Sequence, residues 1–408
     1  MVGPGLRPVV LAATLLLLAA KAFALPEYAV RVTAPNRGYR CTPVSAMLTN
    51  PEAPGSWKGV TVRDPEARAT VPCSALALPD NRTEVTWLVR DLARGASRAY
   101  RVAFVNEAPA PAGVTLGEPT DGAVEIKVGD ALFTRYVYEG APKPYCYPII
   151  GPTGVPVTRS YPMEKVEGED QDHPHQRSLW FTHGEVNGID FWAESDKTGR
   201  QVHREFEALD SGVCGRLRAR NDWVSAEGKK ICEDVRELRV YDIPEVRLFD
   251  YTITVKATDG PVEFGDTKEG TFGVRVASVM DVMEAHPDAH ITNSEGQKDG
   301  EAWGKAANWC DYSGPIDGTM VGVSILDHPT SFRHPTYWHV RTYGLFAANP
   351  FGLRHFIGDT TGKGRFTLQP GEEVTFRYRV LIHPGNVETA KVADWYGEYA
   401  DPPAVTAE

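Results

Sequence analysis

The sequence lacks the signatures of several common enzyme and binding classes. It has no GxSxG, HExxH, glycine-rich phosphate loop or Cys-His nucleophile pattern, so hydrolase triads, zincins and nucleotide enzymes are not indicated. Its six cysteines show no CxxC spacing, which gives no support for a structural zinc or thioredoxin-like site. Positive charge is also scarce: Lys+Arg number 43 against 54 Asp+Glu, a formal net charge of −11. That balance disfavours nucleic acid and anionic membranes as partners.

Long apolar runs are absent after the first residues of the chain. The apolar run from Val9 to Ala20 follows Arg7 and precedes Ala22-Phe23-Ala24, the small-x-small pattern that signal peptidase accepts. The run is shorter than the roughly 20 residues that a spanning helix needs. We therefore predict a signal peptide at 1–24, a secreted or periplasmic protein, and no membrane span after cleavage.

Oxidation of cysteines is possible in such a compartment. Cys41 and Cys73 lie in the same N-terminal region and could pair, but buried free thiols fit the sequence equally well.

Short apolar runs separated by Gly and Pro predict an all-β protein. Residues 25–108 alternate apolar and polar positions, as in Tyr28–Val32 and Ala99–Phe104, which is typical of an immunoglobulin-like β-sandwich. A Pro-Ala segment at 109–112 is predicted to be a stiff linker.

Longer strands dominate the rest of the chain. Runs such as Val246–Val255 need large sheets to cover them, so residues 113–390 are predicted to form one large two-sheet sandwich. Val387–Tyr399 is the one clear helical pattern, and residues 391–408 are assigned to a C-terminal helix and tail.

Histidine is confined to the second of these regions. All 11 histidines fall between residues 173 and 383, and five of them precede proline. Because a residue before proline favours extended backbone, these histidines are expected at strand edges or in loops. In an extended chain His173, His175 and Arg177 would project from one face.

These residues allow three interpretations. In the first, His173 or His175 is a general acid or base that needs no metal. Arg177 neutralises negative charge, and Asp266 or Glu269 supplies a carboxylate. In the second, the His-x-His pair binds a divalent metal, and in the third the groups only bind a ligand. A buried network of satisfied polar groups is the alternative without function.

Aromatic residues accompany the polar ones. Flat rings beside imidazoles and carboxylates suit a sugar, whose CH face stacks on a ring while its hydroxyls form hydrogen bonds. At least half of these aromatics are expected to be core residues instead. The aromatic residues concerned are Trp180, Trp192, Trp303, Trp309, Tyr337 and Trp338.

Several long motifs resemble a family of secreted bacterial proteins labelled "methane oxygenase PmoA", whose function is unsettled. The similarity spans roughly residues 113–390 and includes His173-Pro-His175, Val186–Trp192, Asp266–Gly270, Trp309–Pro315 and His334–His339. The membrane methane monooxygenase subunit that this label evokes spans the bilayer repeatedly, so we do not expect methane oxidation here.

The resemblance implies a galactose-mutarotase-like supersandwich, an architecture that hosts sugar epimerases, lyases and glycoside hydrolases. We therefore expect an exported carbohydrate-active enzyme that uses His/carboxylate acid–base chemistry, with no cofactor assigned. A non-catalytic glycan-binding protein and a metal-dependent enzyme are the alternatives. The expected catalytic residues are His173, His175, Arg177, His183, Asp266 and Glu269, and the expected substrate-binding residues are Trp180, Asp190, Trp192, Lys268, His334, Trp338 and His339.

Overall fold

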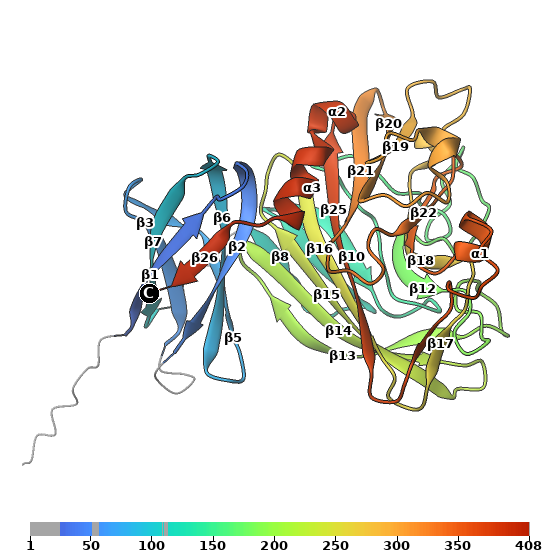
Figure 1. Cartoon of the computed structure of the whole chain (residues 1–408), viewed down its shortest axis with the longest axis horizontal. Helices are drawn as coiled ribbons and strands as arrows, with labels where there is room; N and C mark the ends of the chain where they lie inside the picture. The colour runs from blue at the N-terminus through green and yellow to red at the C-terminus, as the bar shows by residue number, and fades with distance from the viewer. Residues whose placement is uncertain (1–24, 51–56, 108, 110–112, 408) are drawn as a thin grey trace, which may run out of the picture.

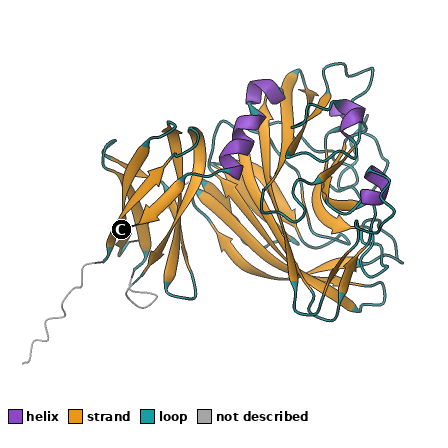
Figure 2. Ribbon diagram, in the orientation of Figure 1, coloured by secondary structure: helices purple, strands orange, loops and turns teal. Residues whose placement is uncertain are grey.

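The computed structural model describes residues 25–50, 57–107, 109 and 113–407. Their backbone forms antiparallel sheets with few helices, arranged as a small sandwich beside a large one (Figure 1, Figure 2). This confirms the all-β class and the predicted order of a small immunoglobulin-like sandwich and a large supersandwich. The predicted signal peptide and, apart from Pro109, the predicted linker lie outside the described residues.

The small sandwich packs a five-stranded sheet against a three-stranded one. Val30, Val32 and Trp87 are at most 1% exposed, because alternate side chains of each strand face the other sheet. Its strands are β1 (Glu27–Thr33), β2 (Tyr39–Thr49), β3 (Gly59–Asp64), β4 (Ala69–Val71), β5 (Cys73–Ala77), β6 (Arg82–Leu92), β7 (Ser97–Val105) and β26 (Ala404–Ala407).

The last strand of the chain belongs to the small sandwich. β26 pairs antiparallel with β1, so that Val30 lies opposite Ala407 and Thr33 opposite Ala404. In Figure 1 this red strand lies beside the blue β1, although the two strands stand at opposite ends of the sequence. The chain therefore returns to the small sandwich after completing the large one, and β26 covers one edge of β1.

The large sandwich consists of two eight-stranded antiparallel sheets. The first sheet contains β8 (Val114–Leu116), β9 (Ala123–Val128), β10 (Ala131–Val137), β11 (Tyr145–Cys146), β12 (Leu179–His183), β18 (Gly270–Arg275), β22 (Tyr337–Val340) and β23 (Leu345–Asn349). The second contains β13 (Arg200–Asp210), β14 (Cys214–Val224), β15 (Lys230–Tyr241), β16 (Arg247–Lys256), β19 (His290–Asn293), β20 (Trp309–Ile316), β21 (Thr319–Asp327) and β25 (Glu373–Pro384).

Minor elements complete the large sandwich. β17 (Val262–Phe264) and β24 (Phe366–Leu368) pair as a small ribbon, and α1 (Leu353–Phe356) is a single helical turn. Two 3₁₀ turns, η1 (Ser278–Met280) and η2 (Asp299–Ala302), lie in the long connections.

The predicted helix over Val387–Tyr399 is present as two pieces. α2 (Val387–Ala390) and α3 (Val392–Ala400) are separated by Lys391, whose φ of +57° interrupts the helical backbone. Trp395 and Val392 of α3 pack with Leu326 and Leu381 on the outer face of the second sheet.

Side-chain contacts join the two sandwiches. Arg239 of β15 forms two hydrogen bonds with Glu84 of β6, at 2.7 and 3.0 Å. Ser74 of β5 exchanges hydrogen bonds with the backbone of Cys214 at 3.1 and 3.0 Å. The small sandwich is therefore held on the large one by polar contacts as well as apolar packing.

The Cys41–Cys73 disulfide is not formed, and all six cysteines are free thiols. Cys41 is buried in the apolar cluster between the sandwiches, while the Cys73 thiol donates to the Val60 carbonyl at 3.4 Å. Burial raises the pKa of both thiols to about 11. Both residues are therefore free thiols, Cys41 buried and Cys73 half-buried.

Candidate functional site

A cavity of about 540 Å³ opens at the first sheet of the large sandwich. Its volume lies within the roughly 300–1,000 Å³ typical of small-molecule sites. It is lined by His173, His175, Gln176, Asp190, Trp192, Ala193, Lys268, Glu269, His339, Arg341 and Tyr343. Four separate segments of the chain supply these residues, so the cavity is a product of the tertiary fold.

The segment that supplies the first two histidines is a turn. His173 has a φ of +41°, and its carbonyl accepts a hydrogen bond from the Gln176 amide at 3.0 Å. The expected extended backbone is therefore wrong here. The turn directs His173 and His175 to the cavity, whereas Arg177 leaves that face and binds Glu194.

Asp172 orients the His173 ring. Its Oδ2 lies 2.6 Å from Nδ1 of His173, and its Oδ1 is held by the fully buried Arg159 and Arg275. Burial alone would raise the pKa of Asp172, but Arg275, His173 and Arg159 together outweigh it and lower that pKa. Because Asp172 is then a carboxylate, its Oδ2 accepts a hydrogen bond from Nδ1–H of His173, and Nε2 is the ring nitrogen that carries no proton in the neutral imidazole.

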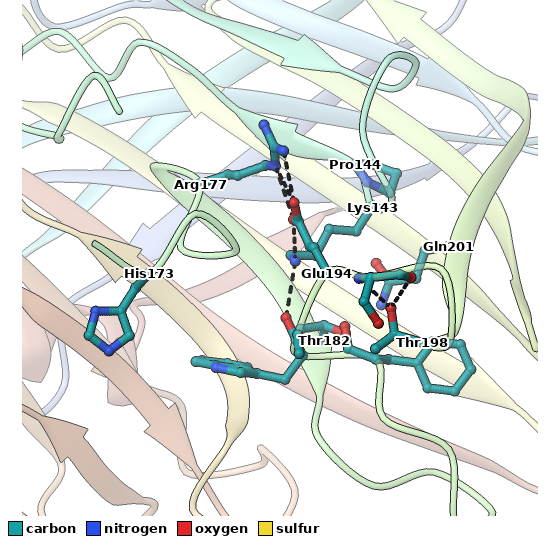
Figure 3. Close-up of polar contacts among 12 residues, drawn as sticks. Lys143, Pro144, His173, Arg177, Thr182, Glu194, Thr198 and Gln201 are labelled. Atoms are coloured by element: carbon teal, nitrogen blue, oxygen red, sulfur yellow. Dashed lines mark hydrogen bonds and ion pairs between the residues drawn. The ribbon is translucent and has the colours of Figure 1, made fainter. Parts of the chain in front are cut away.

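A buried charge cluster lies behind the second histidine. Glu194 accepts hydrogen bonds from Lys143 at 2.7 Å and from Arg177 at 2.8 Å, as Figure 3 shows. Burial, with the positive charge of Lys143 and His173, lowers the pKa of His175 to about 4. His175 is therefore a neutral imidazole at neutral pH.

The loop before β18 supplies an ion pair to the cavity. Lys268 and Glu269 are paired with each other, and both side chains are about one-third exposed, at 39% and 33%. The Gly184 amide donates to the Glu269 carbonyl at 2.6 Å, and a side chain at Gly184 would collide with Glu269. Asn349 donates to the carbonyls of Thr267 and Lys268, which fixes the loop from the other side.

The third side of the cavity comes from β22 and the turn after it. His339 is 2% exposed, and its Nδ1 accepts a hydrogen bond from the Trp303 indole at 2.9 Å. Arg341 and Tyr343 follow in the β22–β23 turn, where the Tyr343 ring stacks on His173 with centroids 5.2 Å apart and an interplanar angle of 9°.

Asp190 and Trp192 form a further wall. Asp190 Oδ1 accepts the backbone amides of Trp192 at 2.7 Å and Ala193 at 3.1 Å, which shapes this loop. The Trp192 ring lies 6.1 Å from His175, measured between centroids. An indole and a carboxylate thus stand beside the histidines.

Of the residues expected from sequence, seven line this cavity and six do not. Those that line it are His173, His175, Asp190, Trp192, Lys268, Glu269 and His339. The six placed elsewhere are Arg177, His183, Asp266, Trp180, His334 and Trp338, and each has a structural contact of its own.

Three of the six are fully buried. His183 Nε2 bonds to the Gly265 carbonyl at 2.8 Å, which supports the loop that carries Lys268 and Glu269. Burial lowers the pKa of His183 to about 4. Trp338 donates to the Ala307 carbonyl at 3.0 Å, and the Trp180 ring packs against the ring of Trp192 with centroids 5.4 Å apart.

The other three have partners away from the cavity. Arg177 is committed to Glu194. Asp266 accepts the Arg354 amide at 3.0 Å at the start of α1. His334 pairs with the buried Asp327 at 2.8 Å.

Sequence reasoning missed Gln176, Arg341 and Tyr343 as lining residues. Gln176 lies inside the Asp172–His183 segment, and Arg341 ends the Asp327–Arg341 segment, so both belong to segments already rich in polar and aromatic residues. Tyr343 is part of a hairpin turn whose length and register are visible only in the structure.

Among the described residues, no three His, Cys, Asp or Glu side chains are grouped so that they could hold a metal ion. His173 Nδ1 is already bonded to Asp172, which leaves only its Nε2 as a possible metal ligand. Within the same residues, no helix has both the length and the apolar character to cross a bilayer.

A model of a protein family described as "Family of unknown function (DUF6807)" matches residues 123–396. The chain therefore belongs to this family, whose matched region contains every residue that lines the cavity. No curated protein shows significant sequence similarity to the chain.

Two solved structures are similar to this chain over about half of their own length. A protein in the glycosyl hydrolase family 38 from Enterococcus faecalis has a TM-score of 0.47 at 11% identity, and an alpha-mannosidase from Enterococcus faecalis V583 has 0.43 at 10%. The matches cover 94% of this chain but 47% and 46% of the other chains, so this chain spans about half their length. Similarity at this level carries no information about activity.

Proposed function

We propose that this protein is an exported carbohydrate-active enzyme that uses His/carboxylate acid–base chemistry. One observation carries the proposal: His173, His175 and His339 line a single cavity together with Glu269, Asp190 and the ring of Trp192. His175 and His339 are largely withdrawn from water at this cavity, and withdrawing polar groups from water costs free energy that packing alone does not require. The same mixture of donors, acceptors and a flat ring suits a sugar.

His173 is the proposed general base. Asp172 fixes its ring through Nδ1 at 2.6 Å, and Arg159 and Arg275 fix Asp172 in turn. This leaves Nε2 of His173 able to take a proton from a sugar hydroxyl, an attacking water or a ring carbon. A base of this kind contributes roughly 10²–10⁴-fold to a rate.

Glu269 is the proposed carboxyl partner of His173. It lines the same cavity from the loop before β18, held there by Gly184 and paired with Lys268. Asp190 has one oxygen committed to two backbone amides, so its main task is to shape the loop. Trp192 supplies an aromatic surface on which a sugar ring could stack, while the Tyr343 ring is already stacked on His173.

The test is a screen of the purified full chain against plant, algal and mucin glycans, with product mass as the readout. Fragments whose masses sum to the substrate plus one water identify hydrolysis, and fragments that sum to the substrate mass with one unsaturated ring identify elimination. An uncleaved product of unchanged mass with altered stereochemistry identifies epimerisation. His173→Ala should lower turnover by about 10²–10⁴-fold with little change in Tm.

His290→Ala is the matched control, because His290 is also an exposed histidine beside an aspartate, with a side chain 54% exposed, but lies outside the cavity. It should retain full turnover. Binding of a glycan without any turnover would overturn the enzymatic proposal in favour of a glycan-binding protein. Equal turnover by both variants would remove His173 from the chemistry.

A further inference from the structure

One end of the cavity is rich in N–H donors. Arg341, Lys268 and His339 lie at this end, and Glu269 is present there as the ion-pair partner of Lys268. A guanidinium and an ammonium are donors only, and neither can accept a hydrogen bond. The chemistry of this end therefore depends on the state of His339.

The Trp303 indole settles which nitrogen of His339 carries a proton. An indole N–H can only donate, and it lies 2.9 Å from His339 Nδ1, so Nδ1 must accept. The neutral imidazole then carries its proton on Nε2. His339 thus contributes a third donor to the cavity.

Positive charge is concentrated at the same end. Burial first, and then the charges of Lys268, Arg341 and His355, lower the pKa of His339 to about 3. Those cations must lie close to His339 to act on it in this way. His339 remains neutral at working pH and keeps the donor arrangement described above.

Arg341 is the cation in this group that lacks a counter-ion. Lys268 is paired with Glu269, whereas no carboxylate of the described residues lies within ion-pair distance of Arg341. The guanidinium carbon of Arg341 is instead 5.8 Å from the ring centres of both Trp303 and Tyr343. The two rings hold the planar guanidinium of Arg341 in place, and its N–H groups remain able to donate hydrogen bonds to a ligand.

We propose that Arg341, with His339 and Lys268, binds an anionic oxygen group on the sugar substrate, either a carboxylate or a sulfate ester. This inference rests on the proposed function and adds the substrate class: an acidic carbohydrate. The planar fork of Arg341 matches two oxygens of such a group, and the His339 Nε2–H supplies a third hydrogen bond. Arg341 thereby takes the role that the sequence suggested for Arg177.

The test is calorimetric binding of matched oligosaccharides to the full chain: a uronic acid trisaccharide, its methyl ester, and a neutral trisaccharide with and without a sulfate ester. We expect at least one anionic member to bind about tenfold or more tightly than its neutral counterpart. Its affinity should fall as ionic strength rises. A preference for the uronic acid or for the sulfate ester identifies which anion is bound.

Arg341→Ala should remove about tenfold or more of that affinity, and Arg341→Lys should restore only part of it, because lysine retains the charge but not the fork. Arg200→Ala is the control, since Arg200 is an exposed arginine of the same sandwich outside the cavity. Equal binding of anionic and neutral sugars, or no effect of Arg341→Ala, overturns the inference.

The outcome for this inference is separable from that for the proposed function. His173-dependent turnover of neutral glycans alone would retain the enzyme and reject the anion site. Anionic binding that requires Arg341 without turnover would retain the anion site and reject the enzyme. Absence of both binding and turnover across the panels would reject both.

Discussion

The small and the large sandwich have the same alternation of apolar and polar residues, but they differ in the kinds of side chain that they bury. The core of the small sandwich consists of apolar side chains such as Val32, Trp87 and Val102. The large sandwich also buries ionisable groups, among them Asp234 and Arg236, whose side chains are 0% exposed. The small sandwich contains no histidine, whereas all 11 lie in the large one.

The difference indicates that buried charged groups are retained where they support the candidate site. Burying a charge costs several kcal/mol unless it is paired and hydrogen-bonded. In the large sandwich these groups form connected supports: Arg159 and Arg275 hold Asp172, which holds His173 at the cavity. In the described part of the small sandwich the buried carboxylate is Asp64, whose Oδ1 accepts the backbone amides of Glu66 and Ala67.

The largest expected effect comes from the buried pair. Arg236→Met should destabilise the large sandwich by about 3–5 kcal/mol, because Asp234 would remain in the core without its cation. Asp234 would still accept hydrogen bonds from the Trp223 indole at 2.6 Å and the Asn221 amide at 2.7 Å. Urea unfolding and hydrogen exchange of β14 and β15 measure the loss.

Asp234→Asn/Arg236→Met is the matched double variant, since it removes both charges. It should recover a substantial part of the lost stability. If the single variant unfolds no more easily than the parent, buried charge is not what distinguishes the two cores.

Much of the fold could be predicted because strand periodicity is a local signal. The alternating runs at Ala99–Phe104 and Val246–Val255 appear as β7 and β16, nearly residue for residue. The return of β26 to β1 could not be predicted, since pairing between residues 30 and 407 depends on where the whole large sandwich places its end. The break at Lys391 depends on one backbone angle that helical periodicity does not encode.

The candidate site was predictable only in part. His173, His175 and Glu269 belong to dense polar segments, and density is visible in a sequence. The direction of a side chain is not: a turn at residues 173–176 replaces the expected strand and separates Arg177 from His175. Likewise Asp266 and Glu269 are three residues apart, yet one caps α1 and the other lines the cavity.

Acid should affect the large sandwich through buried His183. Its folded pKa of about 4 lies below the usual value of 6.5, so the unfolded chain binds more protons between these pH values. Stability should therefore fall as the pH drops from 6.5 towards 4. His183→Gln should make the loss between pH 7.5 and pH 5 smaller by about 2 kcal/mol, as measured by urea unfolding at each pH.

His290→Gln, which changes an exposed histidine, should leave that pH dependence unchanged. If the free energy of unfolding depends on pH in the same way in His183→Gln and in the parent, the burial of His183 has no energetic consequence.

A smaller effect of opposite sign is expected at Asp281, which is 1% exposed and has one oxygen without a hydrogen-bond partner. Burial, opposed by Arg275 and reinforced by Asp170, raises the pKa of Asp281 to about 7. The folded chain then binds the extra proton, so stability falls as pH rises from about 4 to 7. Asp281→Asn should gain about 1 kcal/mol relative to the parent between pH 6 and pH 7.5, measured by urea unfolding.

The small sandwich supplies the control for Asp281. Asp64 is also a buried aspartate, at 8% exposure. Unlike Asp281, it has an Oδ1 that accepts hydrogen bonds from the backbone amides of Glu66 and Ala67, at 2.9 and 3.0 Å. Asp64→Asn weakens two hydrogen bonds to a carboxylate and should therefore lose stability at neutral pH, where Asp281→Asn gains it. If the two substitutions change the stability at neutral pH in opposite directions, the contrast between the sandwiches depends on how each carboxylate is hydrogen-bonded. If they change it in the same direction, the contrast depends on burial alone.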